Sequence, residues 1–479
     1  MLSGKSSWPA GSPPSSHALP LIALCLLNAS PWGSPAGLKK VKAILSETAC
    51  WAAGEEDSRD DDDDDDDDDR GRGGAMGRMR SHVLPQVRTS VDRGTYVACT
   101  FDYEKDLPDG TKGRKAWTDI FRKAIGSFEK RARAQLVDDA ATEEEEAMAE
   151  TRAASFAASY ASILDKLEAD PSQCIPGFEA DFSRADGPGL SCKVLCAIRE
   201  TCLLRIGLRD AFKHVKAKEN RESLVVLPRI IEELESCASA RDRMDLALRG
   251  CFAGNLFDLG AHFSSAKYDE GDSDDRDPWE AFWRTRAALP QRPWWPEASG
   301  LDLLDQAIAR LSTAGTFGKA IVFADNAGAD LVCGILPFVR ELLKAGTRVV
   351  IAANEKPAIN DITAEELLAL FTGVRSHPRV TDPFLLAKVE TGDLSVVSSG
   401  SDLPIIDLSQ VSARVAEEAA NADLIVLQGM GRAIESNLNC DFDRCKAVLK
   451  MGVVKHPEVA LCLGGTLGLP ICKFQVRDM

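Results

Sequence analysis

The sequence lacks several features that mark specialised protein classes. Its 14 cysteines include no Cys-x-x-Cys pair and no His pair downstream at zinc-finger spacing, which argues against a structural zinc site. Basic residues are outnumbered by acidic ones, 57 against 74, and a net charge of −17 does not suit a nucleic-acid binder. The hydrophobic fraction of 44% and the charged fraction of 27% are those of an ordinary globular protein, which excludes a bundle of membrane spans. A length of 479 residues favours two domains.

Residues 1–90 differ in composition from the rest of the chain. They are rich in Ser, Pro, Gly and Ala, and they contain an unbroken acidic run from Asp60 to Asp69 that cannot pack. We therefore predict a disordered low-complexity extension. Leu19 to Leu27 has the outline of a secretory signal, but Pro20 interrupts it and about ten apolar residues are too few to span a bilayer. The scattered cysteines favour a reducing compartment. We expect a cytoplasmic protein that does not bind membranes, with organellar targeting by the extension as the alternative.

Residues 95–300 show a helical pattern and are predicted to form a helical cap domain. Apolar residues recur there at steps of three and four, which is the period of an amphipathic helix. Three such faces are Trp117 to Phe128, Phe156 to Leu167, and Leu195 to Ile206. We identify no catalytic constellation in this region.

From residue 301 to 479 the pattern changes to alternating strands and helices. Alternation of this kind implies an α/β fold: a largely parallel Rossmann-like sheet with helices on both faces, following the N-terminal helical domain. Between the strands, helices are predicted at Val332 to Leu343 and at Val411 to Ala422. The expected strands are Ala320 to Ala324, Arg348 to Ala353, Leu394 to Val397, Leu424 to Leu427, and Cys445 to Met451.

Polar residues follow four of these strands, where open α/β sheets bind their ligands. The groups are Asp325-Asn326-Ala327-Gly328, Asn354 with the loop to Asp361, Gln428-Gly429-Met430-Gly431-Arg432, and Lys455-His456-Pro457-Glu458. Each group alone is as easily explained by helix capping or an ordinary turn. Together they offer hard oxygen ligands for a divalent metal and a positive cradle for phosphate. The combination favours metal-assisted phosphoryl transfer or hydrolysis.

The same motifs resemble those of the damage-control phosphatase family, once called domain of unknown function 89. The resemblance covers roughly residues 95 to 475 and extends into the helical half through Ala253 to Ala261. It is strongest to the second subgroup, which contains plant stand-alone phosphatases and the phosphatase half of vertebrate pantothenate-kinase-like proteins. No kinase half is present in this sequence.

The resemblance implies a metal-dependent phosphatase acting on a small phosphorylated metabolite, 4′-phosphopantetheine or its oxidised forms. By motif match Asp325, Asn326 and Asp361 would bind a divalent ion (Mn, Co, Ni or Mg), and Asp325, Asp361 and Lys455 would be catalytic. The phosphate would be held by Gly429, Met430, Gly431, Arg432 and Lys455. One position departs from the subgroup's Glu-Gly-Met-Gly-Arg signature, because Gln428 replaces the Glu.

Several alternatives stay open at this point. The chain could bind a phosphometabolite without turnover because of Gln428, or hydrolyse sugar phosphates instead. A methyltransferase is weaker, since no Gly-rich loop follows the first strand at nucleotide-binding spacing. The attacking group is either water or Asp325, although the Asp-x-Asp of haloacid dehalogenases is absent because Ala327 follows. His456, Asn255 and Asp258 are left outside the predicted site, and the oligomeric state is undetermined.

Overall fold

The computed structural model describes residues 82–170, 175–179, 190–256, 278–290, 303–373 and 379–477. Most of the predicted extension lies outside these residues. Gly77–Met479 forms one compact unit. No helix among the described segments is long and apolar enough to cross a membrane.

The described residues contain a six-stranded sheet in the order β3-β2-β1-β4-β5-β6. All neighbouring strands are parallel except β5 and β6, which are antiparallel. The order reverses at the β1–β4 pair, so the segments after these two strands diverge to opposite sides and leave room for a ligand. This confirms the predicted fold class. The strands are β1 (Lys319–Phe323), β2 (Arg348–Ala353), β3 (Leu394–Ser398), β4 (Leu424–Gln428), β5 (Ala447–Val453) and β6 (Pro470–Val476).

Alternate residues of each central strand enter two hydrophobic clusters on opposite faces of the sheet. In β1, Ile321 and Phe323 belong to the first cluster, whereas Ala320 and Val322 belong to the second. Burial on both faces explains why these strands are nearly continuous apolar runs. The sequence pattern did not reveal β6. Pro470 begins this edge strand, a position where a missing N–H costs no ladder hydrogen bond.

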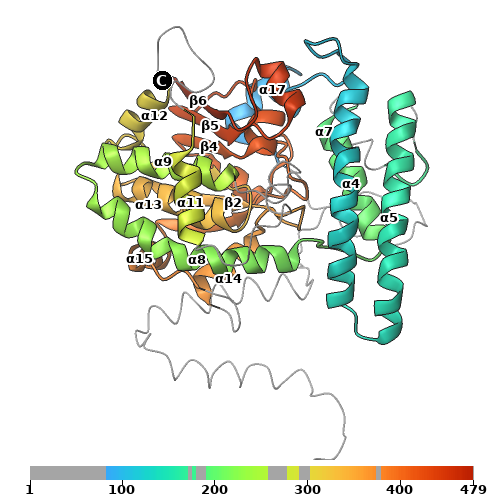
Figure 1. The fold of residues 1–479 in the computed structure, drawn as a ribbon. Coiled ribbons are helices and arrows are strands. Elements are labelled where there is room, and N and C mark those ends of the chain that lie inside the picture. The colour runs from blue at the N-terminus through green and yellow to red at the C-terminus, as the bar shows by residue number, and fades with distance from the viewer. Residues whose placement is uncertain are drawn as a thin grey trace, which may run out of the picture. The chain divides into compact units, whose positions relative to one another are not determined.

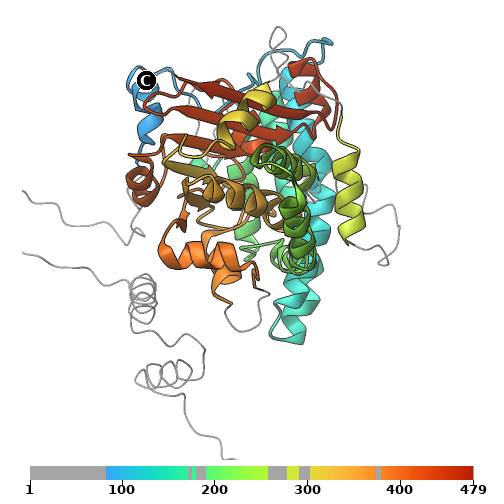
Figure 2. The ribbon, with the colours of Figure 1, turned by 90° about the vertical axis from the view of Figure 1, so that its left-hand side faces the viewer.

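Helices cover both faces of the sheet, as Figure 1 and Figure 2 show. The first cluster includes α4 (Gly113–Asp138), α5 (Glu143–Ala169), α7 (Cys192–Arg205), α16 (Ala413–Ala419) and α17 (Pro457–Leu463). The second includes α8 (Lys213–Ser236), α9 (Ala240–Leu256), α11 (Pro278–Ala287), α12 (Leu303–Leu311), α13 (Leu336–Lys344), α14 (Ala364–Thr372) and α15 (Pro383–Thr391).

The first part of the predicted helical region forms a group of helices beside the strands' carboxyl ends, whereas its later helices α8, α9 and α11 pack on one face of the sheet. Helices α4, α5 and α7 pack against one another (Figure 1). Trp117 and Phe128 of α4 are buried, as the helical period predicted. Thr142 caps the start of helix α5, because its side chain accepts a hydrogen bond from Glu145 N–H. The acidic first turn of α5 suits the positive end of the helix dipole. The predicted boundary between 95–300 and 301–479 stays a prediction.

Two π-helical turns follow the strands at which the strand order reverses. The turn η2 (Asp330–Ile335) follows β1 and leads into α13, so the helix predicted from Val332 begins as a π-turn. The turn η3 (Met430–Glu435) follows β4. A π-turn widens the backbone helix by one residue and occurs frequently at functional sites.

The start of the described chain corrects the predicted boundary of the extension at residue 90. His82 and Val411 exchange two backbone hydrogen bonds of 2.8 Å, and η1 (Pro85–Val87) and α3 (Arg88–Asp92) follow. Leu84 and Val87 are fully buried in the first cluster. Residues 82–90 therefore belong to the folded unit, because their apolar side chains complete its core.

Two truncations should separate the extension from this packed segment. Removing residues 1–81 should leave the thermal midpoint unchanged, whereas removing 1–92 should lower it by several degrees. Burying each of Leu84 and Val87 contributes about 1.5–3 kcal/mol. The midpoints of both truncations and the full chain are measured side by side by circular dichroism. Equal midpoints for the two truncations would contradict a structural role for 82–92.

Candidate active site

The sequence-predicted residues converge at the carboxyl ends of the strands. Asn326, which follows β1, pairs with Asp361 in an isolated β-bridge. Asp325, Asn326, Asp361, Met430, Gly431 and Lys455 line one pocket, which we call the strand-end pocket. Gly429 adopts φ = +97°, and a Cβ atom there would lie 2.1 Å from the carboxyl carbon of Asp325. Glycine is therefore required at this position, because the backbone immediately after β4 lies directly against the Asp325 carboxylate.

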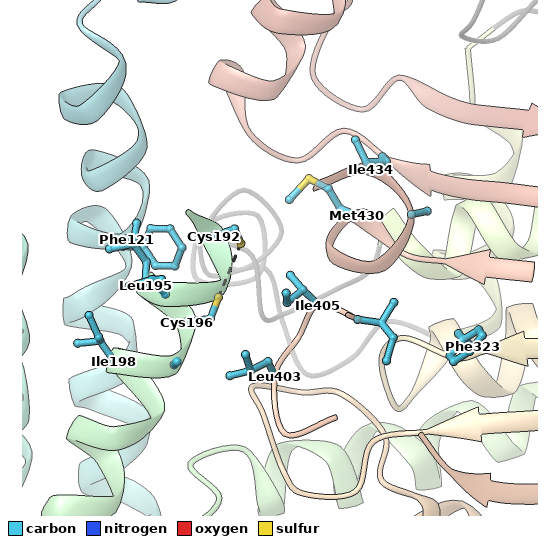
Figure 3. Packing of buried hydrophobic residues seen from close by; sticks show 14 of the residues in the cluster. Phe121, Cys192, Leu195, Cys196, Ile198, Phe323, Leu403, Ile405, Met430 and Ile434 are labelled. Atoms are coloured by element: carbon cyan, nitrogen blue, oxygen red, sulfur yellow. Dashed lines mark hydrogen bonds between the residues drawn. The ribbon is translucent and has the colours of Figure 1, made fainter. Parts of the chain in front are cut away.

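The wall opposite the strand ends comes from the helical region. Helix α4 contributes an apolar stripe, and α7 contributes Cys192, Cys196 and Arg199 at helical spacing. Figure 3 shows these two helices facing the segments that carry Ile405 and Met430. The pocket has an empty volume of about 770 Å³, part of it open to solvent. It is thus polar at the strand ends and largely apolar on the side of α4.

Arg432 lies between the two predicted metal-binding carboxylates. Its side chain is 2% exposed, and its guanidinium forms ion pairs with Asp325 and, at 2.8 Å, with Asp361 Oδ2. A third contact, 2.9 Å to Asn354 Oδ1, fixes its plane. The adjacent carboxylates raise the pKa of Arg432 against the opposing effect of burial. Arg432 therefore stays charged and holds Asp325 and Asp361 together; its predicted contact with phosphate stays a prediction.

The donor set fits a divalent cation. Asn326 Oδ1 is buried and has no hydrogen-bond partner among the described residues, although Nδ2 of the same amide donates to Asp325 and Asp330. A buried acceptor of this kind can serve a hard cation, and the carboxylates of Asp325 and Asp361 lie in the same wall. In the part of the chain that the structure describes, no three His, Cys, Asp or Glu side chains gather as a metal cluster. The predicted set of Asp325, Asn326 and Asp361 is not a cluster of this kind, because one of its three ligands is an amide.

A buried carboxylate, Asp330, supports this arrangement from behind. Its Oδ1 accepts from Gln428 Nε2 at 2.6 Å, and its Oδ2 accepts from Asn255 Nδ2 at 2.8 Å and from Asn326 Nδ2 at 3.0 Å. Gln428 Oε1 in turn accepts from Asp325 N–H at 2.9 Å. Burial, and next the charge of Asp325, raise the pKa of Asp330 to about 7. Gln428 therefore holds the loop after β1 in place and donates a hydrogen bond to Asp330. A Glu at this position could make the same contact only if one of the two carboxyl groups were protonated.

Besides Asp330, three residues near the site were not predicted as members of it. Asn255 at the end of α9 reaches the network, donating to Asp325 and Asp330 and accepting from Val453 N–H. His456 and Glu435 line the pocket. Asp258 lies outside the described residues. Asn255 belongs to the Ala253–Ala261 stretch that carried the resemblance, whereas Glu435 had no signal because it is an isolated carboxylate outside the quoted motifs.

Comparison with known proteins decides the family. Residues 114–468 match the family model of the damage-control phosphatase ARMT1-like domain. The chain belongs to this family. The match spans both the long helices and the sheet, so the strand-end pocket lies within it, and the predicted recognition is confirmed.

Two relatives identified by sequence agree with this membership. The damage-control phosphatase At2g17340 of Arabidopsis thaliana is 38% identical over 395 residues, which cover 82% of this chain and 96% of that protein. The 4′-phosphopantetheine phosphatase of Mus musculus is 30% identical over 436 residues, covering 81% of this chain and 48% of that protein. This damage-control phosphatase thus spans about half of the mouse protein. A DUF89 family protein from Pyrococcus horikoshii matches 73% of the chain at 17% identity, with a TM-score of 0.47.

The Gln428–Asp330 contact predicts a pH-dependent loss of stability in Gln428→Glu. In the folded state, burial beside Asp330 would raise the pKa of the new carboxyl. Above the ordinary Glu pKa of about 4.3 the unfolded chain ionises first, so the penalty grows with pH until the folded pKa is reached. Each tenfold difference in proton affinity between the folded and unfolded states costs about 1.4 kcal/mol. The difference in thermal midpoint from wild type should therefore be larger at pH 8 than at pH 5.

A matched control exchanges the two groups. Gln428→Glu combined with Asp330→Asn restores one amide and one acid across the same contact, so it should recover most of the midpoint at pH 8. A Gln428→Glu midpoint that tracks wild type at both pH values would show that the contact is not maintained in solution.

Proposed function

We propose that this damage-control phosphatase hydrolyses small phosphomonoesters in a metal-dependent reaction, and that its substrate is 4′-phosphopantetheine or an oxidised form of it. The observation that carries the proposal is the two-sided strand-end pocket. Oxygen donors and the Lys455 cation lie at one end, and an apolar wall faces them. Family membership supports a phosphatase; the substrate and the metal are part of the proposal.

Asp325, Asn326 and Asp361 would hold the divalent ion (Mn, Co, Ni or Mg). Such an ion supplies Lewis-acid stabilisation of phosphoryl oxygens when bound. Lys455, 2% exposed in the pocket lining, would hold the phosphate through its positive charge. Arg432 keeps the two carboxylates at fixed positions, which lowers the cost of organising the site during reaction. Either water or Asp325 would attack phosphorus.

The apolar wall supports a substrate with a long, weakly polar arm. Ile120, Phe121, Ala124 and Phe128 of α4 line it, together with Ile405 opposite. A sugar would bury several hydroxyl groups against this wall without partners, and each unpaired hydroxyl is costly. A pantetheine chain places methyl and methylene groups there instead. The mouse relative named 4′-phosphopantetheine phosphatase supports the same substrate.

We also propose a cytoplasmic location. The described cysteines are free thiols, among them the buried Cys192 and Cys196 at the pocket. Persistent thiols suit a reducing compartment. Non-catalytic binding of a phosphometabolite remains the second candidate, favoured by Gln428 standing where the subgroup has Glu, although the bracing contacts of Gln428 are those a structural residue requires.

Phosphate release with each of Mg, Mn, Co and Ni tests the proposal. The purified chain is assayed with 4′-phosphopantetheine, glucose 6-phosphate and p-nitrophenyl phosphate, and kcat/KM should be highest for 4′-phosphopantetheine. Absence of metal-stimulated release from all three substrates would favour the non-catalytic alternative.

Substitution of the three predicted ligands should remove metal-dependent turnover. Asp325→Asn and Asp361→Asn keep an acceptor for Arg432, and Asn326→Ala removes the buried Oδ1. Because loss of a group outside the ligand shell already costs 10–100-fold, each variant should lose at least about 100-fold in kcat/KM. Asp423→Asn, before β4 at the opposite end of the strand, is the control. Retained activity in any two ligand variants with normal thermal midpoints would refute the assignment.

A further inference from the structure

One carboxylate in the strand-end pocket has no role in the function proposed above. Glu435 ends η3 and lines the pocket together with Asp325 and Lys455. Its Oε2 contacts the Cys192 thiol of α7 at 3.8 Å. It is thus held at the junction between the polar strand ends and the helical wall, which is the place where the bond between phosphate and arm would lie.

The chemistry of an alkyl phosphate requires a proton donor at this junction. In hydrolysis, an oxygen from water forms a bond to phosphorus, and the bond from phosphorus to the alkyl oxygen breaks. The departing alkoxide is a strong base that must gain one proton from an acid to leave as an alcohol. The attacking water keeps one hydrogen on the product phosphate and releases the other, which returns the acid to its protonated form. Donation by a positioned acid typically contributes 10²–10⁴-fold to the rate.

We propose that Glu435 is the general acid that protonates the leaving oxygen of the substrate. The proposal rests on the proposed phosphatase function and adds a catalytic residue to it. Asp325 and Asp361 are already engaged in ion pairs with Arg432, so neither is placed to supply this proton. Asp330 lies behind them, with its carboxylate engaged by Gln428, Asn255 and Asn326.

The surroundings of Glu435 keep a proton available near neutral pH. Glu435 is half-buried, and the loss of solvent around its carboxyl group is the main cause that raises its pKa to about 7. The Cys192 contact lowers the pKa, the charge of Asp325 raises it, and Lys455 lowers it. Tyr103, from the segment before α4, also interacts electrostatically with Glu435. His456 lines the same pocket. An acid must be protonated to act, so turnover of an alkyl phosphate should fall as pH rises through about 7.

Leaving-group dependence distinguishes a general acid from a structural residue. Glu435→Gln keeps the size of the side chain but cannot donate an acidic proton. With 4′-phosphopantetheine, whose leaving group is an alkoxide, kcat should fall about 10²–10⁴-fold with little change in KM. With p-nitrophenyl phosphate, whose leaving group is stable as an anion, kcat should change less than about tenfold. The fall in turnover above pH 7 should also disappear from the alkyl substrate's profile.

Two further variants complete the experiment. Glu417→Gln, an exposed carboxylate of α16 that pairs with Arg414, should leave the rates with both substrates unchanged. Glu435→Asp retains an acid and should recover part of the alkyl rate together with its pH dependence. If Glu435→Gln does not fold, Glu435→Asp and wild type are compared across phenyl phosphates of graded leaving-group pKa, and a steeper dependence in the Asp variant is expected.

Results that contradict the role of Glu435 can be distinguished from results that contradict the proposed function. An equal fall with both substrates, or no fall with either, would overturn the assignment of Glu435 while leaving the phosphatase intact. Identical leaving-group dependence in wild type and Glu435→Asp would also overturn it. Absence of metal-stimulated hydrolysis by wild type would instead refute the proposed function itself, and the role of Glu435 with it.

Discussion

The arrangement of the candidate active site depends on one buried carboxylate, Asp330. Its oxygens accept hydrogen bonds from residues at the ends of β4 and α9 and from the loop after β1. Without those donors the carboxylate would be too costly to bury; without the carboxylate the amides of Gln428 and Asn255 would lose their common acceptor. The network therefore fixes the position of Asp325 and Asn326 relative to the sheet before any ligand arrives.

Next to this hydrogen-bond network lies a group of ion pairs centred on Arg432. Arg432 joins Asp325 to Asp361, which come from the segments after β1 and β2, while Arg432 itself follows β4. One guanidinium therefore connects the segments that follow β1, β2 and β4. A buried ion-paired group of this kind favours one arrangement over others more than it adds net stability. In a catalytic site, that selectivity is useful because a misplaced carboxylate costs rate.

Much of this organisation could be predicted from the sequence, and the limits have physical causes. Central strands such as β2 are buried on both faces, so their apolar runs gave nearly exact boundaries. Strand β6 was missed because an edge strand starting with Pro470 carries a weak pattern. Asp325, Asn326 and Asp361 converge because parallel strands end at the same edge. Glu435 and Asp330 could not be found in this way, since their environment comes from helices and strands distant in sequence.

The continuity of the first hydrophobic cluster affects how a substrate enters the strand-end pocket. The cluster runs without interruption from α5 and α7 to Phe323 and Leu427 in the sheet. Helices α4 and α7, which wall the pocket, are therefore part of the same interior as the strands. Swinging them away as a lid would open that interior to water, at a cost of about 25 cal/mol for each Å² of apolar surface exposed. The fold favours a rigid, permanently formed entrance, so encounter and release would be governed by diffusion through its mouth.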